Sequence, residues 1–239
     1  MGVSSGVQTT GAEPRDDGLH FHWWHAILLL LAVLVLGLVL FVTVQPVKVL
    51  PRMTLAPGYS LTDQNGDKLT SEAMRGKFTL YNFTYTNCAA PCPETGSAMR
   101  VLQDRLATVE TGDIPVRLVT ISFDAERDDA ATMLAWAQAN GADPAIWSVA
   151  SGPAANLKAI IGAGFSTYYT QNEDGSFTFD PTFVLVDGNG IIRTKYRTAA
   201  PDPETFARDL GLISQEVANS SGASKLAYEA AHLFLCYPD

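Results

Sequence analysis

The sequence predicts an α/β domain, with a mixed β-sheet flanked by helices, that follows a single N-terminal transmembrane helix. Residues 26–44 form an uninterrupted apolar run, and β-branched or aromatic segments alternate with helix-like segments from residue 58 onward. Two cysteines, Cys88 and Cys92, lie between one predicted strand and the next helix. The predicted parts are a flexible tail with an interfacial belt (1–25), the membrane helix (26–44), a linker (45–57), the α/β domain (58–213) and a C-terminal tail helix (214–239).

Composition and charge exclude some classes of function. The 239 residues carry a formal net charge of −9, and no lysine- or arginine-rich cluster occurs in the sequence. Nucleic acid is not expected as a partner, because phosphate binding needs a basic footprint. Three cysteines are too few for a disulfide scaffold, so a pair spaced by four positions indicates chemistry rather than stapling.

The apolar run AILLLLAVLVLGLVLFVTV predicts a membrane anchor. It carries no charge, and as a helix it would reach roughly 28 Å, close to the thickness of a bilayer core. A cleaved signal peptide is the alternative, but it needs a basic start, a shorter apolar core and a small-residue cleavage site. The flank at 13–17 is acidic to neutral, and VTVQPVK offers no such site. An uncleaved anchor is therefore favoured.

The segment HFHWWH (20–25) stands at the entrance of this helix. Trp and His rings there favour a belt at headgroup depth over a haem or metal site, since nothing nearby completes such a site. Lys48 and Arg52 follow the helix and Arg15 precedes it. This charge count alone weakly favours the main domain inside the cell.

Turn residues and apolar periodicity predict the remaining elements. Asp128 and Ser224 are expected to cap helices. Hairpins are predicted over 61–69, turning at Asn65-Gly66, and over 183–196. Further strands are predicted at 78–84, 116–123 and 146–149, and helices at 93–109, 128–140, 153–161, 201–210 and 225–235.

The cysteine pair carries the strongest functional signal. A strand leads into a turn, and a helix is expected to begin at Cys92, where its partial positive charge would lower the pKa of a thiol. A thiolate is both the nucleophile of disulfide exchange and a soft ligand for Cu(I). An inert bridge or two buried thiols are the alternative, but the strand–turn–helix context favours an active pair.

At these residues the sequence resembles a known family. From about residue 59 to 212 it is similar to the Sco/SenC proteins, copper-handling thioredoxin-fold factors of cytochrome oxidase assembly. The matching segments are LTDQNG (61–66), GKFTL (76–80), CAAPCP (88–93), ISFDAERD (121–128) and FVLVDGNG (183–190). The resemblance implies a thioredoxin-like fold, and copper-binding, redox-active Cys88 and Cys92. It also implies a domain outside the cytoplasm, which overrides the weak charge count.

The sequence departs from this family at the third copper ligand. The family has a histidine where this chain has Phe179, and no histidine occurs between His25 and His232. Two thiolates can hold Cu(I), but Cu(II) would also want an imidazole. His232 and Cys236, four residues apart, could supply extra ligands, although a tail docked on the domain or on a partner is favoured.

Pro181 is a further candidate site residue. Asp180-Pro181-Thr182 resembles the segment of thioredoxin-like reductases in which a cis proline faces the cysteine pair; the alternative is a proline that only ends a loop. Together these features predict a membrane-anchored Sco-like protein acting in cytochrome oxidase copper-site assembly through Cys88 and Cys92. Two alternatives stay open: a metal-free thiol–disulfide oxidoreductase, and a structural subunit of a respiratory or other electron-transfer complex.

Overall fold

The computed structural model describes residues 2, 23–44, 48–90 and 92–234. The chain divides into two compact units, Met1–Pro46 and Val47–Asp239. In the first, α1 (Trp23–Val44) is a helix long and apolar enough to cross a membrane, a test that a signal sequence near the N-terminus also passes. The belt residues 23–25 lie in its first turn, whereas residues 20–22 of the predicted belt lie outside the described residues.

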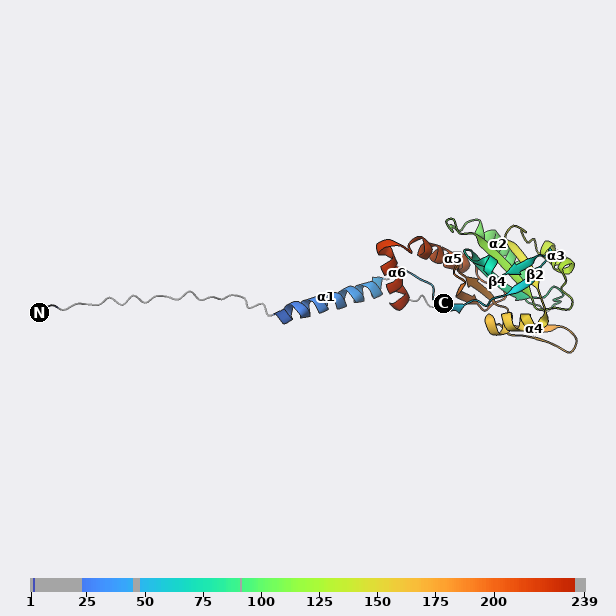
Figure 1. Cartoon of the computed structure of the whole chain (residues 1–239), viewed down its shortest axis with the longest axis horizontal. Helices are drawn as coiled ribbons and strands as arrows, with labels where there is room; N and C mark the ends of the chain where they lie inside the picture. The colour runs from blue at the N-terminus through green and yellow to red at the C-terminus, as the bar shows by residue number, and fades with distance from the viewer. Residues whose placement is uncertain (1, 3–22, 45–47, 91, 235–239) are drawn as a thin grey trace. The chain divides into compact units, whose positions relative to one another are not determined.

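An eight-stranded mixed sheet forms the centre of the second unit (Figure 1). Its spatial order is β1-β10-β9-β4-β5-β6-β2-β3. β4, β5 and β6 run parallel at the centre, and the pairings toward both edges are antiparallel. The strands are β1 (Thr54–Leu55), β2 (Ser60–Asp63), β3 (Lys68–Thr70), β4 (Phe78–Thr84), β5 (Val116–Ser122), β6 (Trp147–Ser151), β9 (Phe183–Val186) and β10 (Ile191–Tyr196).

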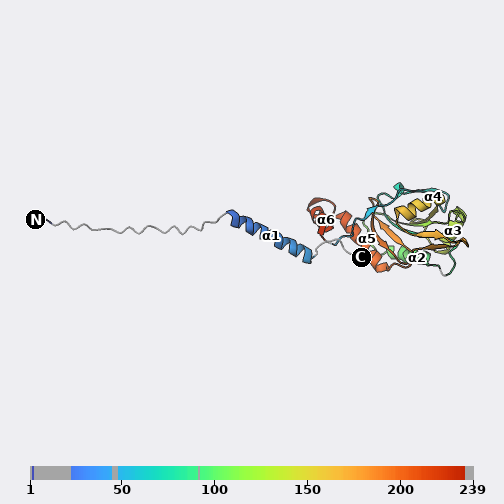
Figure 2. The ribbon, with the colours of Figure 1, turned by 90° about the horizontal axis from the view of Figure 1, so that it is seen from below.

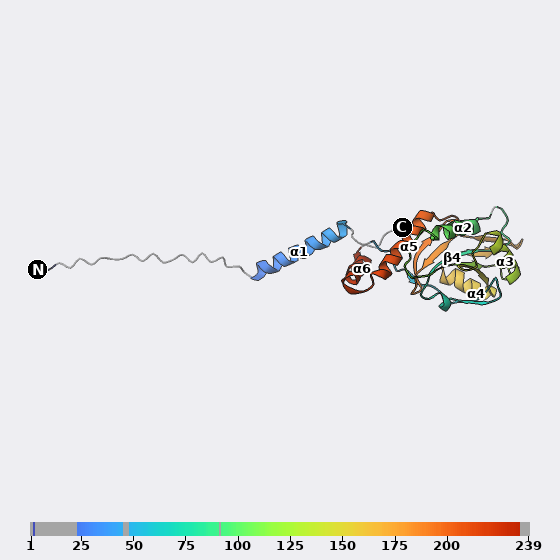
Figure 3. The same ribbon diagram turned by 90° about the horizontal axis from the view of Figure 1, so that it is seen from above.

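Side chains alternate along β4 between two apolar faces of the sheet. Phe78 and Leu80 belong to the core that also contains residues of α2 (Thr95–Leu106), α3 (Ala130–Ala139) and α5 (Pro203–Ala218). Tyr81 and Phe83 belong to the core shared with α4 (Ala154–Leu157) and the π-helical segment η2 (Lys158–Gly164). Figures 2 and 3 show α2 and α4 on opposite sides of the strands. Parallel strands covered on both faces confirm the predicted α/β class.

Several elements differ from their predicted extents. β1 lies within the predicted linker, because backbone hydrogen bonds to Ile192 and Gly190 add this segment to the edge of the sheet. α5 continues to Ala218, beyond the predicted helix end at 210 and the predicted domain boundary at 213, because its buried face extends to Glu216. A hairpin that was not predicted, β7 (Tyr169–Gln171) with β8 (Phe177–Phe179), forms a separate two-stranded sheet.

The C-terminal helix α6 (Gly222–Phe234) begins earlier than predicted. A short 3₁₀ helix, η1 (Glu72–Met74), lies between β3 and β4. The prediction that Ser224 caps α6 is wrong. Its Oγ donates to the carbonyls of Asn219 and Ser221 at 3.1 and 2.8 Å. The hydroxyl therefore closes the turn between α5 and α6 instead of accepting from a helix amide.

A buried ion cluster joins α5 and α6 to the segment before β1. Arg193 is 1% exposed, and its guanidinium contacts Asp187 at 3.1 Å and Glu216 at 2.5 Å. It also donates to two backbone carbonyls at residues 50 and 51. Glu216 further accepts from Arg52 at 2.7 Å and contacts His232 at 2.9 Å. Arg193 and Glu216 can be buried as charged groups because each of them is paired with oppositely charged or hydrogen-bonding partners.

The cluster predicts a specific acid sensitivity. Burial alone would raise the pKa of Glu216, but hydrogen bonds from His232 and Arg193 outweigh burial and lower the pKa from 4.5 to about 2. Because the folded-state value is the lower one, Glu216 stabilises the fold above about pH 4.5, and this contribution is lost as the pH falls toward 2. In urea denaturation across this range, Glu216→Gln is expected to be less stable at pH 7 and to lack this part of the pH dependence. The same pH dependence in both proteins would contradict the assignment.

Candidate redox site

The chain passes from β4 directly into the loop that carries the cysteines. Cys88 and Cys92 are half-buried and joined by a disulfide, with their Cα atoms 5.5 Å apart. α2 begins at Thr95 rather than at the second cysteine, because the Thr95 amide donates to the Pro93 carbonyl at 2.8 Å in a tight turn. The strand–turn–helix context is therefore as predicted. The positive end of the helix dipole, however, acts on Cys92 from three residues away.

Asp128 fastens the start of the loop to the neighbouring strand. Its carboxylate accepts from the amide of Thr86 at 2.9 Å and from the Thr86 hydroxyl at 2.6 Å, and it accepts a further hydrogen bond from Ser122. The prediction that Asp128 caps the helix is wrong. The cap of α3 is Asp129, which accepts from the Thr132 amide at 2.8 Å. Asp128 is 4% exposed and serves the cysteine loop instead.

The two adjacent aspartates predict different costs of substitution. Asp128→Ala is expected to lower the free energy of unfolding by about 3 kcal/mol, because the donors of Thr86 and Ser122 lose their acceptor. Asp129→Ala removes a solvent-exposed cap and is expected to cost about 1 kcal/mol. Chemical denaturation of the two variants measures the difference. A larger loss for Asp129→Ala would show that the loop does not depend on Asp128.

One wall beside the disulfide is aromatic. The Phe123 ring lies 5.0 Å from Phe177 and 5.1 Å from Phe179, and the Tyr85 ring lies 5.1 Å from Phe177. Cys88 packs against the core that contains these rings. Tyr85, Phe177, Phe179 and both cysteines line a cavity of about 590 Å³. The unpredicted hairpin thus supplies one side of the space in front of the disulfide.

Arg127 holds the hairpin in this position. Its Nε contacts the Asp124 carboxylate at 2.5 Å, and its Nη2 donates to the carbonyl of Gly175 in the hairpin turn at 2.5 Å. Its guanidinium carbon lies 6.0 Å from the centre of the Phe177 ring. Asp124 is 1% exposed, so it is a fixed anchor for the arginine. The segment 124–128 therefore positions the cysteine loop through Asp128 and the aromatic wall through Arg127.

A second cavity, of about 330 Å³, lies where the cysteines meet α2 and α3. Both cysteines, Thr95 and Asn140 are among its lining residues. α2 approaches α3 closely here, since a Cβ on Gly96 would come within 2.2 Å of the Asn140 side chain. Thr95 is 1% exposed, and its Oγ1 has no hydrogen-bond partner among the described residues. A buried hydroxyl in that state is uncommon in native folds.

The donor atoms at this site fit Cu(I) better than Cu(II). Two thiolates, formed when the disulfide is reduced, are a suitable set for soft Cu(I). Phe179 lines the same cavity as both cysteines, at the position where the family resemblance implies an imidazole. Within the described part of the chain, no three His, Cys, Asp or Glu side chains gather as a metal-binding group. The residues present therefore do not fit a Cu(II) site that needs a nitrogen ligand.

His232 does not come near the disulfide. It contacts Glu216, in the ion cluster beside the loop that follows β9. β9 is antiparallel to β4, and its last residue, Val186, pairs with Thr79 near the start of β4. Cys88 follows the opposite end of β4, roughly 20 Å away along the strand. His232 is therefore a docking residue of α6 in this structure.

Pro181 and Cys236 are the remaining predicted site residues. Pro181 lies between β8 and β9, and it is not among the described residues that line either cavity beside the cysteines. Its contribution to exchange stays a prediction. Cys236 lies outside the described residues.

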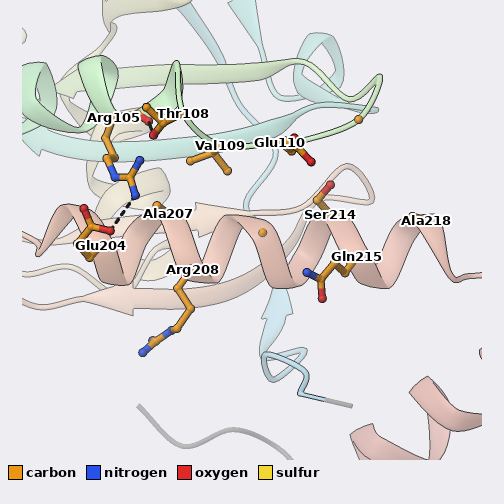
Figure 4. Close-up of a pocket in the computed structure, with 12 residues that line it drawn as sticks. Arg105, Thr108, Val109, Glu110, Glu204, Ala207, Arg208, Ser214, Gln215 and Ala218 are labelled. Atoms are coloured by element: carbon orange, nitrogen blue, oxygen red, sulfur yellow. Dashed lines mark hydrogen bonds and ion pairs between the residues drawn. The ribbon is translucent and has the colours of Figure 1, made fainter. Parts of the chain in front are cut away.

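A further groove, of about 580 Å³, lies between α2 and α5, away from the cysteines (Figure 4). The ion pair of Arg105 with Glu204, at 2.7 Å, crosses one end of it. Its described lining contains no cysteine or histidine, and small residues of α5 form its floor. The described lining of this groove offers no redox chemistry, so the disulfide is kept as the candidate functional site.

Comparison with known proteins identifies the family of the chain. The profile of the SCO1/SenC family matches residues 48–214. The chain belongs to the SCO1/SenC family. A SCO1 homolog of Bacillus subtilis is 31% identical over 70 residues, which cover 29% of this chain and 35% of the relative. The match thus spans about a third of that relative's length.

Solved Sco structures share the fold. BsSco, reported with a disulfide switch and as a member of the Sco family of cytochrome c oxidase assembly proteins, has a TM-score of 0.62 at 21% identity. The aligned region covers 69% of this chain and 96% of the BsSco chain. The copper-bound ScoI of Bradyrhizobium japonicum has a TM-score of 0.50 at 29% identity. The alignment covers 65% of this chain and 97% of the ScoI chain. The predicted thioredoxin-like fold of this Sco domain is confirmed.

Sequence reasoning missed three contributors to the site: the β7–β8 hairpin, Arg127 and Thr95. The hairpin had a detectable signal, since Asp174-Gly175 separates two short segments rich in aromatic and β-branched residues. Arg127 stood within a recognised segment, but its partner Gly175 is 48 residues away. For Thr95 no local signal exists, because its burial depends on the packing of α2 against the sheet and α3.

Proposed function

We propose that this chain is a membrane-anchored Sco-family factor that acts in cytochrome oxidase copper-site assembly by thiol–disulfide exchange. α1 would hold the domain on the extracytoplasmic side, and a pair of cysteines on a client protein would be the target. The observation that carries this proposal is the Cys88–Cys92 disulfide, half-buried between two cavities on a loop that Asp128 fixes. The disulfide switch reported for BsSco and its place among oxidase assembly proteins support the same reading.

The exchange needs only the two cysteines of this chain. In the reduced protein, the Cys88 thiolate attacks a client disulfide and forms a mixed disulfide, while the displaced client sulfur leaves as a thiolate and takes a proton. The Cys92 thiolate then attacks the Cys88 sulfur and releases the second client sulfur. Two electrons pass to the client, and the Cys88–Cys92 disulfide forms. The aromatic wall provides an apolar surface for the client segment.

Transport of Cu(I) is a second candidate function. It is favoured by the two soft sulfur donors of the reduced loop and by the copper bound to the Bradyrhizobium relative. Copper would then be a cargo held between Cys88 and Cys92. Delivery of a two-coordinate ion requires no histidine, so Phe179 does not exclude this role.

Both candidates can be tested on the full chain in detergent. Exchange predicts that the reduced protein reduces a peptide disulfide with stoichiometric formation of Cys88–Cys92. Copper transport predicts one equivalent of Cu(I) per reduced chain in competition with a chelator. No exchange together with tight Cu(I) binding would reject the first proposal. If the chain purifies from native membranes in fixed stoichiometry with a respiratory complex and neither activity is found, it is a structural subunit.

Topology is tested separately. The proposed orientation predicts that a membrane-impermeant thiol reagent labels the reduced Cys88 from outside intact cells or spheroplasts. Labelling only after the membrane is opened would place the domain in the cytoplasm, where a stable disulfide is not expected.

A further inference from the structure

Thr95 is a polar residue at the disulfide for which exchange by two cysteines gives no role. It is the first residue of α2, follows Cys92 by three positions, and lines the 330 Å³ cavity with both cysteines. Its side chain is buried, and Oγ1 makes no hydrogen bond to any described residue. Leaving a buried hydroxyl unpaired typically costs about 1–3 kcal/mol. Such a group calls for an explanation.

The position of Thr95 removes the usual local acceptor. A threonine inside a helix often donates to the carbonyl one turn earlier, but Thr95 begins α2 and has no preceding helical turn. The residue that caps the helix is Glu94, and the Thr95 amide is already used on the Pro93 carbonyl. The disulfide sulfurs of Cys88 and Cys92, which line the same cavity as Thr95, are only weak acceptors in the oxidised loop.

We propose that Thr95 donates a hydrogen bond from Oγ1 to the Cys92 thiolate in the reduced protein. Reduction by two electrons breaks the Cys88–Cys92 bond and leaves a sulfur anion, a strong acceptor, on the loop next to this hydroxyl. Cys92 is the partner because it adjoins α2, whereas Cys88 packs against the aromatic side of the sheet. The inference rests on the proposed exchange function and assigns Thr95 to its second step.

The Thr95 hydroxyl would shift the equilibrium between the two redox states in one direction, through its effect on each state. It stabilises the reduced loop through the thiolate, and the oxidised loop leaves the hydroxyl unpaired. Both effects make the Cys88–Cys92 disulfide easier to reduce. They also raise the fraction of Cys92 that is thiolate, the form that resolves the mixed disulfide.

The test measures the reduction equilibrium of the full chain in glutathione buffers, with thiolate absorbance at 240 nm followed against pH. Thr95→Val keeps the shape and removes the hydroxyl. It is expected to lower the reduction equilibrium constant about tenfold, which for two electrons is about 30 mV toward more negative potential. It should also lower the thiolate fraction of Cys92 at pH 7 about tenfold, and Thr95→Ser should restore both values.

Thr79→Val is the matched control. Thr79 is as buried as Thr95, but it lies near the start of β4, at the end of the strand away from the cysteine loop. Thr79→Val is expected to leave the potential and the thiolate fraction unchanged. A wild-type potential in Thr95→Val overturns the inference while leaving the exchange function intact, and so does an equal shift in Thr79→Val. If the wild-type loop does not cycle with glutathione at all, both proposals fail. Should Thr95→Val not fold, Thr95→Ala supplies the same comparison.

Discussion

Cys88→Ser is expected to abolish reduction of a client disulfide, down to the uncatalysed rate. The hydroxyl that replaces the thiol is not a nucleophile toward disulfides near neutral pH, so no mixed disulfide can form at residue 88. The measurement is the release of thiol from a disulfide-bonded peptide by the reduced full chain in detergent. Exchange that persists at the wild-type rate would show that Cys88 is not the attacking residue.

Cys92→Ser serves as the paired variant. It keeps the attacking thiol and removes the resolving one, so the mixed disulfide between Cys88 and the peptide should accumulate. Mass spectrometry of the trapped adduct identifies the attacking cysteine directly. An adduct that accumulates in Cys88→Ser instead would reverse the proposed roles of the two residues. Folding is checked in both variants by the unfolding transition of the reduced proteins.

Phe179→His is expected to produce a Cu(II) site that the wild-type chain does not have. The new imidazole would line the same cavity as the two sulfurs, so the donor set would become two thiolates and one nitrogen. We expect the affinity of the reduced protein for Cu(II) to rise by at least about tenfold, or about 1.4 kcal/mol. The measurement is anaerobic titration, with thiolate-to-copper charge-transfer absorption as the readout.

Tyr168→His is the control for this gain. Tyr168 is 55% exposed, precedes β7, and is not among the described residues that line the cavity. A histidine there adds an imidazole to the surface without placing it beside Cys88. Equal Cu(II) binding by the two variants would mean that the effect is not specific to the position of Phe179. Unchanged Cu(I) binding in Phe179→His is expected, since the two sulfurs are retained.

The sequence alone determined the elements that depend on local patterns. The apolar run 26–44 predicted α1, and the alternation of apolar strands with helices predicted the sheet, because burial on both faces needs continuous apolar segments. The turn at Gly66 was predicted at the observed position. The φ angle there is +85°, a conformation that glycine adopts without steric cost. The spacing of Cys88 and Cys92 was enough to expect a disulfide-capable loop, since residues four apart in a turn can place their Cα atoms 5–6 Å apart.

What surrounds that disulfide was decided by tertiary structure. Of two adjacent aspartates that both suit a helix cap, Asp129 caps the helix and Asp128 holds Thr86, because only the fold brings the loop and the β5 end together. His232 pairs with Glu216 at the far end of the sheet, although its spacing from Cys236 had permitted a metal site. Phe179 and Thr95, whose hydroxyl has no hydrogen-bond partner among the described residues, line two different cavities beside the cysteine pair and come from segments far apart in sequence. Such long-range contacts leave no periodic signal in the chain, and they determine what the two cysteines can bind and how readily they are reduced.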